Sequence, residues 1–194
     1  CIGPVPDAWL DVADEAGLLI QNEYFIWGYR PEWNTGEVTA QFREWMRDNW
    51  NHPSVVIWDA SNETRSEILT REVIPAVRHL DLSNRPWENG YNPPAGPDDP
   101  VENHPYENFY PGRPFELTDL ETSAGAPLKM DGERTPATAH AMINNEYASF
   151  WLTREGEPTY RTKPKWDRML PNATPAERLA YYATFSVLAI YLHE

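Results

Sequence analysis

The stretch NHPSVVIWDASNET, residues 51–64, decides how we interpret this chain. Its residues 55–58 are an apolar run of the length and composition that a buried strand needs. The run leads within a few residues to the pair Asn62-Glu63. In barrels of parallel strands, functional side chains stand at the C-terminal ends of the strands. The stretch therefore predicts a buried strand that presents the Glu63 carboxylate at such an end.

A second Asn-Glu pair occurs further along the chain. Asn145-Glu146 follows another apolar run, Ala141-Met142-Ile143. Two glutamates at the ends of strands suggest a pair of carboxylates. Glycoside hydrolysis is the chemistry that uses two carboxyl groups, one on each side of the bond that breaks. The residues alone therefore favour this reaction class.

Helices and strands are predicted in alternation along the chain. We expect strands at residues 18–23, 54–58, 83–87 and 140–144, with a strand end at 100–106. We expect helices at residues 6–16, 37–50, 65–80, 115–122 and 175–193, the third of them kinked at Pro75. The remaining long segments are predicted as loops at 88–114 and 147–171 and as a polar linker at 129–138.

This alternation is typical of a parallel sheet with helices outside it. The longer loops follow the strands, which favours a (β/α)₈ TIM barrel in the α/β class. A complete barrel takes about 250 residues, however, and the chain has 194. We therefore expect residues 1–194 to be part of one barrel domain, with an open sheet whose edges are unpaired.

Two predicted helices carry an apolar face at helical spacing, and we expect the face of the second helix to point inward. In the helix at 6–16 the face consists of Trp9, Val12, Ala13 and Ala16. In the helix at 37–50 it consists of Val38, Phe42, Trp45 and Met46.

Composition excludes some partners. The formal charge of −14 argues against nucleic acids and anionic membranes, which both need a basic face. No apolar run approaches the roughly 18 residues of a membrane-spanning helix. The single cysteine, Cys1, cannot form an internal disulfide. The chain opens without Met in what resembles the middle of a domain, so we expect a fragment of a longer protein.

Aromatic residues are frequent, with 9 Trp and 10 Tyr. They suit either an aromatic core or the stacking of sugar rings on exposed aromatic faces. Trp27 and Trp151 are the candidates for sugar stacking, and core packing is the alternative for both.

Three segments resemble glycoside hydrolase family 2. NHPSVVIWDASNE, residues 51–63, is similar to the acid/base motif of that family, and WLDVADEAGLLIQNE, residues 9–23, resembles the segment that precedes it. Asn145-Glu146-Tyr147, followed by FWLTREG at 150–156, resembles the nucleophile region of the β-galactosidase-like members. The resemblance covers most of the chain in the family's order.

The resemblance implies a retaining exo-β-glycosidase, most similar to β-galactosidases, that acts on a carbohydrate without a cofactor. Glu63 would be the general acid and base, and Glu146 the nucleophile, with carboxyl groups about 5–5.5 Å apart. Asn62 would bind the sugar 2-hydroxyl. Family members often have Gly before the Asn-Glu pair, where this chain has Ser61. A β-glucuronidase, an algal-polysaccharide hydrolase and a non-catalytic relative or inert fragment remain alternatives.

The resemblance also implies what else the parent protein contains. The chain would run from the helix before the third barrel strand to the helix after the seventh. The remaining barrel strands and accessory β-sandwich domains would lie elsewhere in the parent, and a homo-oligomer is compatible with the sequence.

Further site residues follow from the family's pattern. Some members bind magnesium with a carboxylate at the position of Glu23 and a histidine two residues later, where this chain has Phe25. A hard cation needs several oxygen ligands, so we expect no metal and assign Glu23 to substrate contact. The other predicted substrate-binding residues are Trp87, His104, Tyr106 and Trp151.

Overall fold

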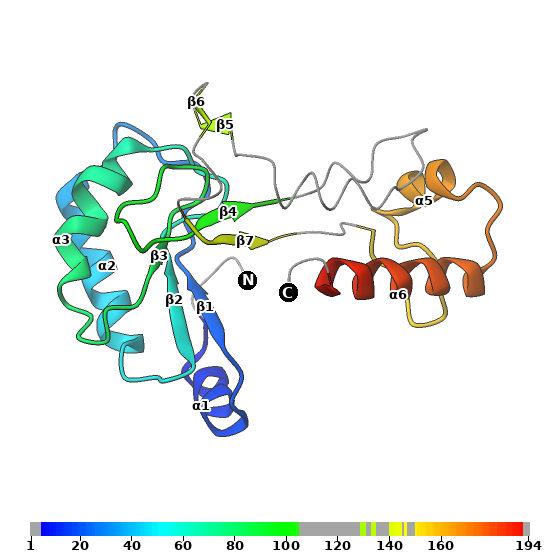
Figure 1. Ribbon diagram of the computed structural model, residues 1–194, viewed down its shortest axis with the longest axis horizontal. Coiled ribbons are helices and arrows are strands. Elements are labelled where there is room, and N and C mark those ends of the chain that lie inside the picture. Colours follow the sequence, from blue (N-terminus) through cyan, green and yellow to red (C-terminus); the bar gives the residue numbers. More distant parts are fainter. Residues whose placement is uncertain are drawn as a thin grey trace. The chain divides into compact units, whose positions relative to one another are not determined.

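The structure, a computed structural model, describes residues 5–104, 129–130, 133–134, 140–144, 146 and 150–191 (Figure 1). It divides into two compact units, which we call the sheet unit (Cys1–Glu102 and Pro127–Ile143) and the helical unit (Asn103–Ala126 and Asn144–Glu194). The predicted helix at 115–122 lies outside the described residues. The assignment of residues 1–194 to one barrel domain stays a prediction.

The sheet unit contains the parallel sheet that the sequence predicts. Its strands are β1 (Ile20–Glu23), β2 (Val55–Asp59) and β3 (Trp87–Glu88), hydrogen-bonded in the order β1-β2-β3. The helix α2 (Thr35–Asn49) connects β1 to β2, and η1 (Leu69–Val73) with α3 (Ile74–Arg78) connects β2 to β3. Figure 1 shows α2 and α3 on the same side of these strands. Each connection is thus a β-α-β crossover, the repeat from which TIM barrels are built.

The remaining strands form two short pairs. β4 (Val101–Asn103) pairs with β7 (Met142–Asn144), which confirms the predicted strand at 140–144. β5 (Lys129–Met130) pairs antiparallel with β6 (Glu133–Arg134), so the prediction of a polar linker is wrong for these residues. Three of these four residues are charged, and strands of two residues are too short to show an alternating hydrophobic pattern.

The core lies between the sheet and α2. Trp58 and Trp87 are neighbours in register on β2 and β3, and both are fully buried. Trp45 of α2 packs edge-on against Trp58 with 5.0 Å between ring centroids. The predicted inward face of this helix is confirmed, because Val38, Phe42, Trp45 and Met46 are all buried. Large aromatic side chains of this kind dominate core energetics through the apolar area they remove from water.

The first helix, α1 (Asp7–Ala16), has the predicted extent. It ends at Gly17, whose φ of 72° suits glycine. Trp9 and Val12, which belong to its predicted apolar face, are 63% and 64% exposed. Leu18 and Leu19, predicted as part of a buried strand, are also largely exposed, and the strand begins at Ile20.

These apolar side chains line an open groove beside β1. Among the described residues, β1 has only β2 as a sheet neighbour. Periodicity therefore identified an apolar face correctly but could not tell what covers it.

The helix predicted at 65–80 contains the turn of π-helix η1 just before Pro75. The Ile74 N–H bonds to the carbonyl of Leu69, five residues back. Pro75 has no N–H to donate to the preceding turn, which explains why the ladder changes register at this point.

The helical unit contains α5 (Lys163–Met169) and α6 (Pro175–Tyr191) around Phe150, Trp166 and Phe185. The start of α6 is confirmed by a capping box: Thr174 Oγ1 accepts from the Glu177 N–H, and Glu177 Oε2 accepts from the Thr174 N–H. The prediction of a loop at the position of α5 is wrong. Only Trp166 of this helix is buried, so the segment has no apolar face at helical spacing that would indicate a helix. No helix in the described part of the chain is long and apolar enough to cross a membrane.

Gly90, in the loop after β3, fixes the position of the loop 61–64. Its φ is 53°, and a Cβ added there would lie 2.8 Å from the Ser61 carbonyl oxygen and 3.0 Å from the Thr64 nitrogen. Gly28 has a similar φ of 82°, but an added Cβ would meet nothing within 4 Å. Both glycines therefore have a left-handed backbone, but only Gly90 is packed closely against the loop 61–64.

We predict that Gly90→Ala destabilises the protein more than Gly28→Ala. Both variants place an alanine in the left-handed region, which costs about 1–2 kcal/mol. Only Gly90→Ala also pushes the loop 61–64 away, which adds about 1–3 kcal/mol. Urea unfolding of the two variants measures the difference. Equal losses in the free energy of unfolding would show that the loop does not rest on Gly90.

Candidate functional site

Glu63 stands just beyond the C-terminal end of β2, in the sheet unit. The chain there continues the alignment of the sheet: the Ala60 N–H donates to the Glu88 carbonyl, and the Asn62 N–H donates to the Ile26 carbonyl. Asn62 also forms an isolated parallel bridge with Trp27. The loop is thus held from both neighbouring segments, and the predicted position of Glu63 at a strand end is what the structure shows.

The backbone of Glu63 is strained. Its φ is 42°, a left-handed value that is uncommon for a residue other than glycine. Thr64 holds this turn: its hydroxyl donates to the Asn62 carbonyl at 2.7 Å and accepts from the Gly28 N–H at 2.9 Å. Strain of this kind persists only where the surroundings determine the conformation, and it clusters at functional sites.

Tyr91 contacts the Glu63 side chain directly. The phenol donates a hydrogen bond to Glu63 Oε1 at 3.1 Å. The Tyr91 backbone N–H also donates to the Thr64 carbonyl. Tyr91 was not predicted as a site residue, because a tyrosine in a loop rich in Pro and Gly gives no signal of its partner.

Asn62 and Trp27 lie beside Glu63 in the loop region. Asn62 is only 3% exposed, and its Oδ1 accepts no hydrogen bond from the described residues. Trp27 is 67% exposed, so its ring is open to a ligand. Glu23, at the end of β1, is buried at 7% exposure.

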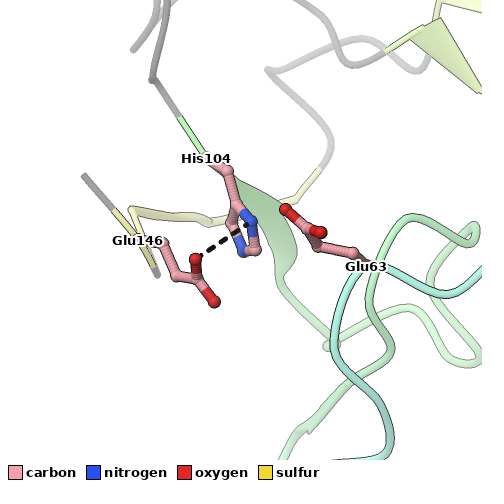
Figure 2. A group of neighbouring side chains, drawn as sticks. All are labelled: Glu63, His104 and Glu146. Atoms are coloured by element: carbon pink, nitrogen blue, oxygen red, sulfur yellow. Dashed lines mark ion pairs between the residues drawn. The ribbon is translucent and has the colours of Figure 1, made fainter. Parts of the chain in front are cut away.

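The helical unit carries Glu146, and Figure 2 shows His104 beside it. His104 Nδ1 lies 3.8 Å from Glu146 Oε2, and the His104 side chain is almost fully buried while Glu146 is partly exposed. The assignment of His104 to substrate binding stays a prediction. Trp151 of the same unit is 52% exposed. Tyr106 and Asn145 lie outside the described residues.

The assignment of Trp87 to substrate contact is wrong. Its side chain is 0% exposed and packs in the core against Trp58. Successive residues of a strand point to opposite faces, so the end of β3 sends Trp87 into the core and Glu88 to the other face.

Asp59, Glu88 and Glu102 form a buried group of carboxylates in the sheet unit. Asp59 and Glu88 are neighbours in register on β2 and β3. Each of the three side chains offers an oxygen within 4.8 Å of the others, and all three residues are almost fully buried. Gln21 Nε2 donates to Asp59 Oδ2 at 2.8 Å. This group could not be predicted from the sequence, since its members are far apart in the chain.

Burial changes the protonation of this group. Burial raises the pKa of Asp59 to about 6, and the nearby charge of Glu102 acts in the same direction. Burial, together with the charges of Asp59 and Glu102, raises the pKa of Glu88 well above its usual value. Three buried carboxylates can be neutralised by protons or by a divalent cation, which takes oxygen ligands of this kind.

We predict that Asp59→Asn stabilises the protein increasingly as the pH rises. Because the pKa of Asp59 is higher in the folded state, the folded chain binds more protons than the unfolded chain. The contribution of Asp59 to the free energy of unfolding therefore falls as the pH rises from about 4 to about 6. For Asp59, the rise from 3.8 to about 6 corresponds to about 3 kcal/mol by pH 7–8. Asparagine carries no charge and keeps an acceptor for the Ser61 N–H. The loss of stability that Asp59 causes at high pH should therefore be absent from the Asp59→Asn variant.

Urea unfolding with EDTA at pH 4, 6 and 8 measures this difference. Glu67→Gln is the matched control, because the Glu67 side chain is 69% exposed. The control should follow the parent protein at every pH. If Asp59→Asn and the parent showed the same dependence of stability on pH, the raised pKa of Asp59 would be contradicted.

Comparisons with known proteins agree with this geometry. Residues 8–92 match the family model of the TIM barrel domain of glycosyl hydrolases family 2. The chain is 27% identical to the β-galactosidase BgaC of Bifidobacterium adolescentis, over 84% of the chain and 17% of that protein. It is 30% identical to a putative β-glucuronidase of Formosa agariphila, over 91% of the chain and 16% of that protein. The chain spans about one sixth of the length of these curated relatives.

Solved structures show the same fold. The β-D-glucuronidase of Dictyoglomus thermophilum matches with a TM-score of 0.57 at 20% identity, over 78% of this chain and 30% of that one. A β-glucuronidase of Bacteroides uniformis matches with a TM-score of 0.60 at 19% identity, over 92% of this chain and 23% of that one. Residues 8–92 therefore carry part of the TIM barrel domain of glycosyl hydrolases family 2.

Proposed function

We propose that this chain supplies both catalytic glutamates of a retaining exo-β-glycosidase of the β-galactosidase type. The observation that carries the proposal is the strained turn at Glu63, held by Thr64 and in contact with Tyr91 at the end of a parallel strand. A surface glutamate would need no such support. The match of residues 8–92 to family 2 makes a glycosidic bond the expected target.

The proposed reaction uses Glu63 as the acid. Glu63 protonates the oxygen of the leaving group while the Glu146 carboxylate attacks the anomeric carbon, which forms a covalent glycosyl-enzyme. Glu63 then removes a proton from water, and the water releases the sugar with its configuration retained. The Tyr91 phenol donates to Glu63 Oε1 and would help to orient the carboxyl group.

The neighbouring residues have complementary roles in this proposal. His104 would orient the Glu146 carboxylate through a ring N–H, from its position 3.8 Å away. The Asn62 Oδ1, without a hydrogen-bond partner in the described part of the chain, would accept from the sugar 2-hydroxyl. Trp27 and Trp151 would offer aromatic faces to the sugar, because both are more than half exposed.

A β-glucuronidase is the second candidate. The relative from Formosa agariphila is a putative β-glucuronidase, and solved glucuronidases share the fold. Aryl β-galactoside and aryl β-glucuronide, offered separately to the full-length protein that contains this chain, decide between the two. We expect the galactoside to be the better substrate. A preference for the glucuronide would make β-glucuronidase the first candidate and β-galactosidase the second.

We predict that product stereochemistry separates the roles of the two glutamates. In Glu146→Ala, hydrolysis should stop, and added azide should restore turnover with an inverted α-glycosyl azide as the product. The anion fills the space of the lost carboxylate and attacks the same face of the sugar. In Glu63→Ala, substrates with good leaving groups should still form the glycosyl-enzyme, and azide should then give a retained β-glycosyl azide.

NMR of the azide products from the full-length variants measures this outcome. Glu67→Ala, at an exposed position on the helix after β2, serves as the control and should keep the activity of the parent. The same stereochemistry from both rescued variants would overturn the assignment of roles. Full activity of either variant without azide would remove that glutamate from the mechanism.

A further inference from the structure

A second concave surface lies in the sheet unit, next to the loop that connects β1 to α2. It is a cavity of about 450 Å³, lined among others by Phe25, Glu32, Trp33, Asn34, Glu37 and Gln41. None of these side chains has a role in the proposed reaction.

Two aromatic rings of the lining are accessible. Phe25 is 51% exposed and Trp33 is 39% exposed. Both are held by neighbours: Tyr24 stacks on Phe25 with 4.6 Å between centroids, and Tyr29 packs edge-on against Trp33 at 5.4 Å. Aromatic rings that are fixed but open to solvent can pack against the C–H face of a pyranose ring at little cost in conformational entropy.

The polar groups of the lining suit hydroxyl groups. The Gln41 Oε1 accepts from the Tyr24 phenol at 2.8 Å, which directs the amide oxygen toward Tyr24 and leaves the amide N–H groups as donors. Glu32 and Glu37 offer carboxylate oxygens, which can accept from two neighbouring hydroxyls. Aromatic walls with a few acceptors and donors are the usual composition of a small-molecule site.

Charge narrows the choice of sugar. Among the described residues, the lining includes two glutamates and no lysine, arginine or histidine. A uronate carboxylate in the cavity would meet like charges without a compensating cation, which is unfavourable. The cavity therefore suits a neutral pyranose unit.

The cavity adjoins the segment that carries Glu63. Ile26, another of its lining residues, accepts the Asn62 N–H through its carbonyl at 2.9 Å. Glu63 is the next residue after Asn62. An oligosaccharide whose terminal sugar occupied the proposed site could extend along this segment to the cavity.

We propose that the cavity is an outer subsite for a neutral pyranose unit of an oligosaccharide substrate, on the leaving-group side of the bond that is cleaved. This proposal rests on the proposed function, because an exo-glycosidase releases the terminal sugar and any outer site must hold the remainder. It assigns the enzyme a preference for neutral oligosaccharides over glycosides with a small leaving group.

The test compares two kinds of substrate in the full-length protein. Trp33→Ala should lower kcat/KM for neutral β-linked oligosaccharides about tenfold and leave kcat/KM for an aryl β-glycoside within about twofold, because the aryl glycoside has no second sugar for the cavity to hold. Tyr160→Ala, which removes an aromatic ring that is 96% exposed, is the matched control and should change neither value. Glu32→Gln with Glu37→Gln should improve the use of oligosaccharides with a uronate next to the terminal sugar.

The outcomes separate this inference from the proposed function. If the aryl glycoside is hydrolysed and Trp33→Ala affects both substrates equally or neither, the subsite is overturned and the function stands. If no glycoside is hydrolysed, the proposed function is overturned. Calorimetric binding of a neutral tetrasaccharide to Glu146→Ala and to Glu146→Ala with Trp33→Ala then decides the subsite, which is supported only if Trp33→Ala weakens binding.

Discussion

The left-handed turn at Glu63 is the constraint on which the candidate site depends. A residue with a side chain pays about 1–2 kcal/mol for this backbone conformation, so the turn must be held from outside. Thr64 holds it through its hydroxyl, between the Asn62 carbonyl and the Gly28 N–H. Gly90 allows the loop after β3 to approach the same turn closely. The position of one carboxylate thus depends on loops that follow three successive strands.

The alternation of side chains along the strands explains how one sheet serves both stability and chemistry. β2 and β3 end in Trp-Asp and Trp-Glu, and the register places Trp58 beside Trp87 and Asp59 beside Glu88. The tryptophans pack on α2 and supply the apolar contact that holds the sheet to its helix. The carboxylates occupy the opposite face, where burial raises the pKa values of Asp59 and Glu88. A shift of register by one residue would exchange the two faces and destroy both arrangements.

Much of this could be predicted from the sequence, because the signals were local. The apolar run at 55–58 and the inward face of α2 each depend on spacing within one element, and both are confirmed. The capping box of α6 is equally local. Trp87 was misplaced because a strand end offers two faces, and two residues of β3 do not say which one a side chain takes. Leu19 was predicted in a buried strand because an apolar run shows no partner, and the structure leaves it exposed.

The residues that the sequence could not reveal are those that meet only in space. Tyr91 reaches Glu63 from a loop 28 residues away, and Glu102 joins Asp59 and Glu88 from a different sheet. Such contacts leave no periodicity in the chain.

A crystal structure of the full-length protein with a bound substrate analogue tests whether Glu63 and Glu146 act together as a retaining pair. We expect a separation of about 5–5.5 Å between the two carboxyl groups, with the anomeric carbon between them. A separation of about 6.5–9.5 Å would indicate an inverting enzyme. A separation of more than about 10 Å would contradict the claim that the two glutamates form one catalytic site.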